Sequence, residues 1–180
     1  MDVVPIWLWH KPGAHDDLQL ELGDLRRGCC SCNLLLLDDT LTHQTDSFGA
    51  LARFLQLWLD ELDKLCQRPG ETFLPFDFYD QGSSWLRVHT GDTIEATVVA
   101  GDRSVQGLFL KASEFAEYAH LGFHPWAGTE LTCDLNDLIR TLVENRDALN
   151  SRSELPVDFS SRRHRRWRLS VAARLRRRHQ

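Results

Sequence analysis

The chain has 180 residues, 42% of them hydrophobic, and its 26 acidic and 21 basic residues give a net charge of −5. This length suits one domain with a sizeable core. No apolar stretch is long enough to span a bilayer, and the first residues lack the basic leader and cleavage site of a signal peptide. Five cysteines, an odd number, do not suggest a disulfide framework, so we expect reduced thiols and a cytoplasmic protein without a membrane partner.

Strands are predicted in the first part of the chain. Residues 3–9 form an apolar run, and leucines alternate with polar residues over 18–22. Residues 29–37 are apolar on both faces, which favours a central strand. The polar stretch 23–28 between the last two segments is predicted to be a turn.

The hydrophobic period then changes to that of a helix ending at Arg68. Thr45 or Asp46 is the expected N-cap, because either side chain can accept from the free amides of the first turn. The Pro-Gly pair at 69–70 breaks the pattern. Apolar residues recur at helical spacing at Phe48, Leu51, Leu55, Leu62 and Leu65.

Strand periodicity returns in the second half. We predict strands over 84–90, 93–101 and 104–110, separated by Gly-Asp turns at 91–92 and 101–102. A short helix over 113–120 and a loop over 121–130 follow. A second amphipathic helix covers 133–149, with Asp134 as its N-cap.

The order of these elements predicts an α+β fold. Short connections favour antiparallel pairing, so we expect one curved antiparallel sheet of about six strands in two meanders, packed against two amphipathic helices. Residues 1–150 would form a single domain. Residues 151–180 would form a polar linker and a flexible arginine-rich tail.

An acidic and aromatic stretch is the most distinctive feature of the predicted domain. It places Asp77, Tyr79 and Asp80 shortly before Trp85. The two carboxylates could act as acid and base or hold a cation, or they could stand at a strand entrance with the aromatics in the core. Alternatively, these four residues form an exposed surface for a basic protein partner. Without the nine arginines of 161–180, 12 basic and 26 acidic residues remain, a balance of −14 that suits such a partner.

Cysteine and histidine pairs raise the alternative of a small metal-dependent enzyme. Cys29 and Cys32 are spaced C-x2-C, and His120 and His124 are spaced H-x3-H, as in zinc sites. Buried core cysteines are the competing explanation. The chain has no G-x-S-x-G, P-loop or G-x-G-x-x-G motif, so we expect a protein without catalytic activity or cofactor.

The C-terminal segment supports a third hypothesis, a nucleic-acid-binding accessory protein. An electrostatic, salt-sensitive grip on phosphates with a stacked base would use Arg162, Arg163, Arg165, Arg166, Trp167 and Arg168. The same segment could instead fold back onto the acidic body, or it could be a disordered extension.

The pattern over residues 15–150 resembles small bacterial immunity proteins of polymorphic toxin systems, notably the WapI type. The stretches that carry it are "CSCNLLLLDD", "FGALARFLQLWLDELDKL", "FDFYDQGSSWLRVHTGDTIEATVVAG" and "LTCDLNDLIRTLVENRDAL". The resemblance implies a cytoplasmic, non-catalytic protein that occludes one cognate toxin by stoichiometric binding. The acidic and aromatic surface at residues 77–85 would then cover the basic active site of the toxin.

Overall fold

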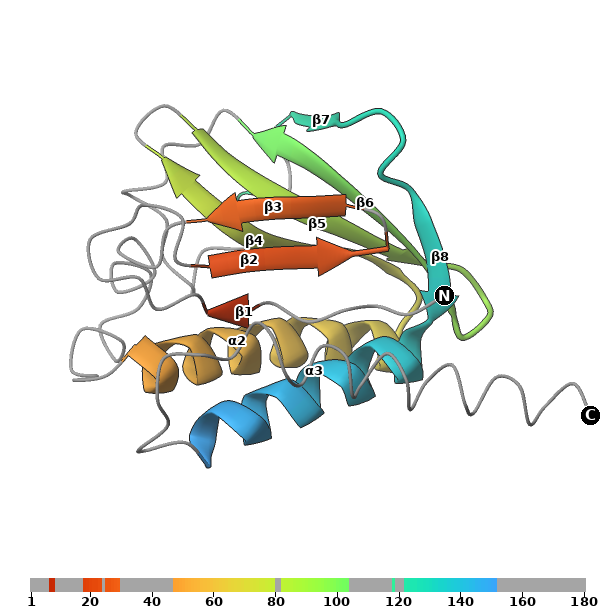
Figure 1. Ribbon diagram of the computed structural model, residues 1–180. Coiled ribbons are helices and arrows are strands. Elements are labelled where there is room, and N and C mark those ends of the chain that lie inside the picture. The colour runs from red at the N-terminus through yellow and green to blue at the C-terminus, as the bar shows by residue number, and fades with distance from the viewer. Residues whose placement is uncertain are drawn as a thin grey trace, which may run out of the picture.

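The computed structural model shows an α+β architecture, as predicted, with antiparallel strands packed on two helices (Figure 1). Neither of these helices has the length and apolar character needed to cross a membrane. The structure describes residues 7–8, 18–23, 25–29, 47–79, 82–103, 118 and 122–151.

Two amphipathic helices form one layer. Helix α2 spans Ser47–Gln67 and helix α3 spans Leu135–Asn150, close to the predicted ranges. Asp134 caps α3 as expected, because its Oδ1 accepts from the backbone amides of Asn136 at 2.7 Å and of Asp137 at 3.3 Å. The predicted caps of the first helix, Thr45 and Asp46, lie outside the described residues.

The larger sheet has five antiparallel strands. They are β4 (Gly70–Tyr79), β5 (Gly82–Thr90), β6 (Glu95–Arg103), β7 (Phe123–Pro125) and β8 (Leu131–Asp134). Their order is β4-β5-β6-β7, and β8 also pairs with β6. A bulge between Pro75 and Asp77 places Phe76 as an extra residue on β4.

A second, three-stranded sheet contains β1 (Trp7–Leu8), β2 (Leu18–Leu22) and β3 (Leu25–Cys29). The single sheet expected from the sequence is therefore corrected to two sheets among the described strands. The predicted turn over 23–28 is wrong, because β3 runs through most of it. Only Gly23, with a φ of 57°, supplies the left-handed conformation of a tight turn. Apart from Cys29, the predicted strand over 29–37 lies outside the described residues.

Two further boundaries differ from the prediction. The Gly101–Asp102 turn is wrong, because β6 continues through both residues and pairs there with β7. The predicted loop over 121–130 contains β7, whose three residues are too few to show a period. The predicted strand over 104–110 lies outside the described residues, as does the helix over 113–120 except for Tyr118.

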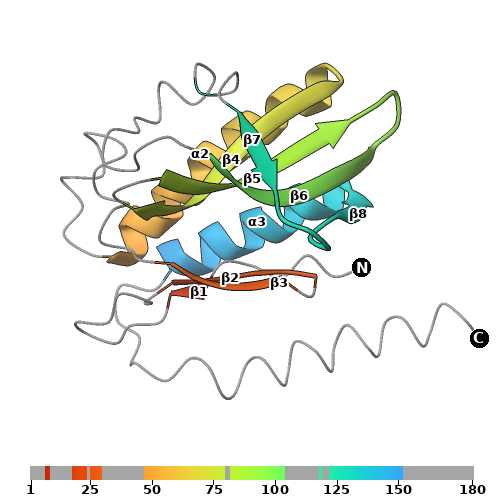
Figure 2. The same ribbon diagram turned by 90° about the horizontal axis from the view of Figure 1, so that it is seen from above.

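The main core lies between the helices and the inner face of the larger sheet (Figure 2). Strand β6 contributes the small side chains Ala96, Val98 and Ala100 to this core. The three-stranded sheet lies beside α3, and its Leu20 joins the same core. The helices contribute most of the remaining buried side chains: Leu51, Phe54, Leu55, Trp58, Leu62, Leu135, Leu138 and Leu142.

Helix α2 also closes the free edge of β4. The indole N–H of Trp58 donates to the carbonyl oxygen of Pro75 at 3.0 Å, and the Thr72 hydroxyl donates to Glu61 Oε2 at 3.3 Å. Proline has no amide to offer a further strand, and its carbonyl is already taken. Unpaired edge groups are a template for unwanted strand pairing, so these contacts protect the edge.

Trp58→Phe tests the closure of this edge. The substitution leaves the buried Pro75 carbonyl without its indole donor, so we expect the free energy of unfolding to fall by about 1 to 3 kcal/mol. Urea denaturation followed by circular dichroism measures the change. The control is Phe54→Leu, one turn earlier on α2, which removes ring volume but no hydrogen bond. A loss no larger than that of the control would contradict the role given to the hydrogen bond.

Gly101→Ala tests the packing of β7 on β6. A Cβ at this position would lie 2.5 Å from the carbonyl oxygen of His124 and 2.6 Å from the Phe123 ring. We expect a loss of about 1 to 3 kcal/mol in thermal or urea unfolding, because backbone must move. Gly91→Ala is the matched control, since its Cβ would meet nothing within 4 Å. Equal stability of the two variants would show that β7 can move away from β6 without a loss in the free energy of unfolding.

Candidate functional site

Trp85 does not belong to an exposed surface. Its exposed fraction is 0%, and its indole N–H donates to Ser83 Oγ at 2.6 Å. Its ring faces the Arg103 guanidinium, whose carbon lies 5.2 Å from the ring centre. The prediction of Trp85 as an exposed anchor for a partner is therefore wrong, and its ring is part of the packing.

Two of the other predicted partner-binding residues, Asp77 and Tyr79, lie at the far end of β4. Asp77 is half-buried and stands opposite Ser84 of β5. Tyr79 is the last residue of β4, and the structure describes only its backbone. Asp80 lies outside the described residues. The structure thus places Asp77 and Trp85 on neighbouring strands without combining them in one exposed surface.

Asp77 begins a row of polar residues that crosses four strands. The row continues through Ser84 and Asp102 to His124, which stand opposite one another in the register. Ser84 Oγ donates to Asp102 Oδ1 at 3.0 Å, and the Trp126 indole donates to Oδ2 at 2.6 Å. Both carboxylate oxygens of Asp102 therefore accept hydrogen bonds that tie β5 and the end of β7 to β6. The sequence prediction missed Asp102 because it lay in a supposed turn.

Ser84 is buried, with an exposed fraction of 3%, so the hydrogen bond from its hydroxyl to Asp102 joins two strands inside the protein. Of the predicted zinc ligands, Cys32 and His120 lie outside the described residues, and Cys29 is described only in its backbone. His124 is exposed on β7. The described ranges contain no group of three or more His, Cys, Asp or Glu side chains that could hold a metal ion.

Arg103 is the most deeply buried charged side chain in the described part of the chain, with an exposed fraction of 1%. Its guanidinium carbon lies 3.6 Å from the ring centre of Phe73, 5.2 Å from that of Trp85 and 5.8 Å from that of Phe123. Nη1 donates to the carbonyl oxygen of Tyr118. Burial lowers the pKa of Arg103 to about 10, while nearby Glu71 acts in the opposite direction. The side chain therefore stays charged at neutral pH and fastens Tyr118 to the outer face of the sheet.

Arg103→Lys tests this aromatic site. Lysine keeps the charge but loses the planar guanidinium that stacks on the rings, so we expect a loss of about 2 kcal/mol in the free energy of unfolding. Arg87→Lys is the control, because Arg87 is half-buried and stacks more loosely, 5.4 Å from the centre of Phe123. Chemical denaturation at pH 7 compares the two variants. If Arg103→Lys is as stable as Arg87→Lys, the stacking geometry is unimportant.

The opposite end of the larger sheet carries an exposed acidic surface. We define this turn-end surface as Glu71, His89, Asp92, Ile94 and Glu95. All five side chains are exposed, and Glu71 stands opposite His89 at the ends of β4 and β5. Ile94, 62% exposed, is the large apolar side chain that the described residues leave to solvent. The sequence prediction placed Ile94 in a strand over 93–101, whereas β6 begins at Glu95 and Ile94 belongs to the preceding turn.

The turn that presents Ile94 is anchored on α3. The Ile94 carbonyl oxygen accepts from the backbone amide of Leu135, the first residue of α3, at 2.8 Å. Thr93 Oγ1 accepts from the Glu95 amide at 3.3 Å. The exposed side chain therefore stands on a backbone fixed to the helix layer.

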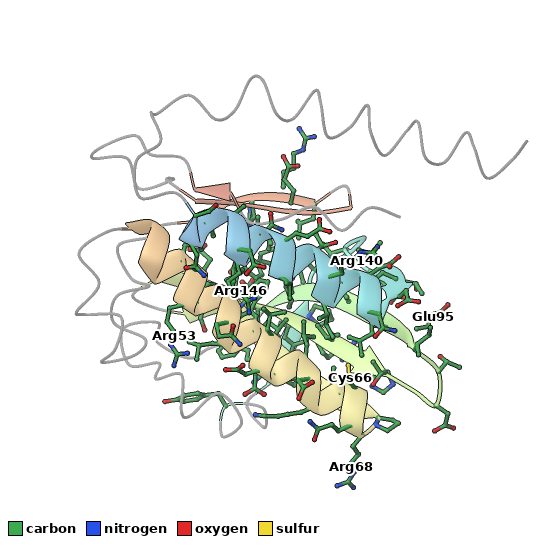
Figure 3. All side chains as sticks on the ribbon, turned by 90° about the horizontal axis from the view of Figure 1, so that it is seen from below. Arg53, Cys66, Arg68, Glu95, Arg140 and Arg146 are labelled. Atoms are coloured by element: carbon green, nitrogen blue, oxygen red, sulfur yellow. The ribbon has the colours of Figure 1, made fainter. Side chains whose placement is uncertain are left out.

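Negative charge predominates around this turn. Among the described residues, no ion pair involves Glu71, Asp92 or Glu95. Figure 3 shows Glu95 at the same end of the molecule as Arg68 and Arg140. Arg140 forms an ion pair with Asp137 at 2.7 Å. Arg68 forms no ion pair with another described residue. The surface thus offers three carboxylates outside the described ion pairs around one apolar side chain.

The predicted nucleic-acid contacts at 162–168 lie outside the described residues. No family model matches the chain, and no curated protein matches it. One chain of the solved CdiA-CT/CdiI toxin and immunity complex from Enterobacter cloacae is similar in structure, with a TM-score of 0.49 and 10% sequence identity. The match covers 82% of this chain and 99% of that chain.

Proposed function

We propose that this protein is a non-catalytic immunity protein that occludes a cognate bacterial toxin by stoichiometric binding through the turn-end surface. The observation that carries the proposal is Ile94, an exposed apolar side chain on an anchored turn beside exposed carboxylates. The toxin as the class of partner comes from the sequence resemblance to immunity proteins.

The surface has the properties that a basic protein partner would recognise. An apolar side chain that becomes fully buried on binding supplies most of the affinity of a small contact. Carboxylates around it accelerate encounter with a cationic surface and exclude acidic partners. Because the Ile94 carbonyl is already fixed to α3, little backbone entropy is lost on binding.

The mechanism that follows is coverage rather than chemistry. The active site of a nuclease or of another enzyme that acts on anions is basic, and a complementary acidic surface closes it to substrate. Asp77, Tyr79 and Asp80, at the other end of β4, stay a prediction for additional contacts. They would enlarge an interface that needs roughly 800 Å² on each partner to be stable.

Ile94→Ser, made in the full chain, tests the proposal. We expect the dissociation constant of the toxin complex to rise by about tenfold to a hundredfold, because the buried anchor is lost. Isothermal titration calorimetry with the catalytically inactivated toxin measures the affinity, and co-expression with the active toxin measures protection. The control is Glu144→Gln, an exposed acid on α3 more than two turns from Leu135, the residue bonded to the Ile94 turn. Unchanged affinity in Ile94→Ser, with folding intact, would exclude the turn-end surface as the binding site.

A further inference from the structure

We propose that the arginine-rich segment 161–180 docks on the turn-end surface of the same chain and competes there with the partner. The competition rests on the proposed function, whereas the docking does not. The surface carries Glu71, Asp92 and Glu95, all exposed and outside any ion pair of the described residues. The segment contains nine arginines and no acid.

The chain is long enough for this contact. Helix α3 begins beside the turn, since the Leu135 amide donates to the Ile94 carbonyl, and its 16 residues carry the chain about 24 Å away. Ten residues, 152–161, separate Ser151 from Arg162. An extended stretch of that length reaches about 35 Å, so the arginines can return along α3 to the turn.

The two parts are complementary in polarity as well as charge. Trp167 lies among the first arginines of the segment, and the exposed Ile94 side chain offers its ring an apolar contact on the surface. Guanidinium groups also bind carboxylates in a bidentate manner. Two cations are near these carboxylates in sequence or register, the exposed Arg68 before β4 and the half-buried Arg87 on β5, against three carboxylates.

Attachment to the same chain makes a weak contact effective. An exposed ion pair contributes little on its own and is screened by salt. A tethered segment, however, has an effective concentration on the order of millimolar at its site. Docking would therefore lower the apparent affinity for a partner. The apparent dissociation constant equals the intrinsic one divided by the fraction of molecules whose surface is free.

Tryptic cleavage of the full chain tests the docking without any partner. The first variant, Glu71→Gln/Asp92→Asn/Glu95→Gln, neutralises the surface. The matched control, Asp60→Asn/Asp63→Asn/Glu144→Gln, removes the same charge from exposed positions on the helices. Mass spectrometry follows cleavage after Arg162 to Arg168, and cleavage after Arg146 reports on folding. At low salt we expect about fivefold faster cleavage in the first variant than in the wild type or the control, and no difference at 0.5 M salt.

Three other results would overturn the docking. Equal cleavage rates in all three proteins would mean that the segment is not held at the surface. Equal acceleration in both variants would assign the effect to net charge. Protection that rises with protein concentration would assign the contact to a second copy of the chain. The cleavage experiment contains no partner, so the docking can fail while the proposed function stands, and the reverse.

Discussion

The hydrogen-bonded pairing of β6 is the constraint on which the other elements depend. One edge of this strand pairs with β5 along almost its whole length, and the other pairs first with β8 and then with β7. Its inward residues Ala96, Val98 and Ala100 are buried in the core that α2 and α3 also line. A strand paired on both edges and covered on one face cannot shift its register by one residue without exposing its core residues. The positions of both ends of the sheet follow from this register.

The two ends of β6 have opposite character for a physical reason. At its C-terminal end, Asp102 and Arg103 point to opposite faces, and each is held by aromatic neighbours. Their polar groups are used within the protein. At its N-terminal end, Glu95 follows a turn whose backbone is bonded to α3 while its side chains remain in solvent. Charged groups that are not used internally are available to a partner.

The helices show where local sequence is sufficient. Apolar side chains at helical spacing can be buried together only by a helix, and Pro69–Gly70 ends the first one wherever the rest of the chain lies. Asp134 was likewise predictable, because a cap acts on amides two and three residues away. Strands β5 and β6 were recognised by alternation. Strand β7 was not, since its three residues are too few to show a period and it is defined by its partner.

Periodicity, capping and chain breaks thus determined the α+β class, both helices and the two central strands, because these signals act over a few neighbouring residues. Residue type alone suggested that Trp85 was an exposed anchor, and it did not predict that Arg103 would be buried. Tertiary structure decided both, because Trp85 and Arg103 lie against each other and the aromatic site of Arg103 comes from three different strands. The exposure of Ile94 was decided in the same way, because it depends on α3, more than 40 residues further along the chain.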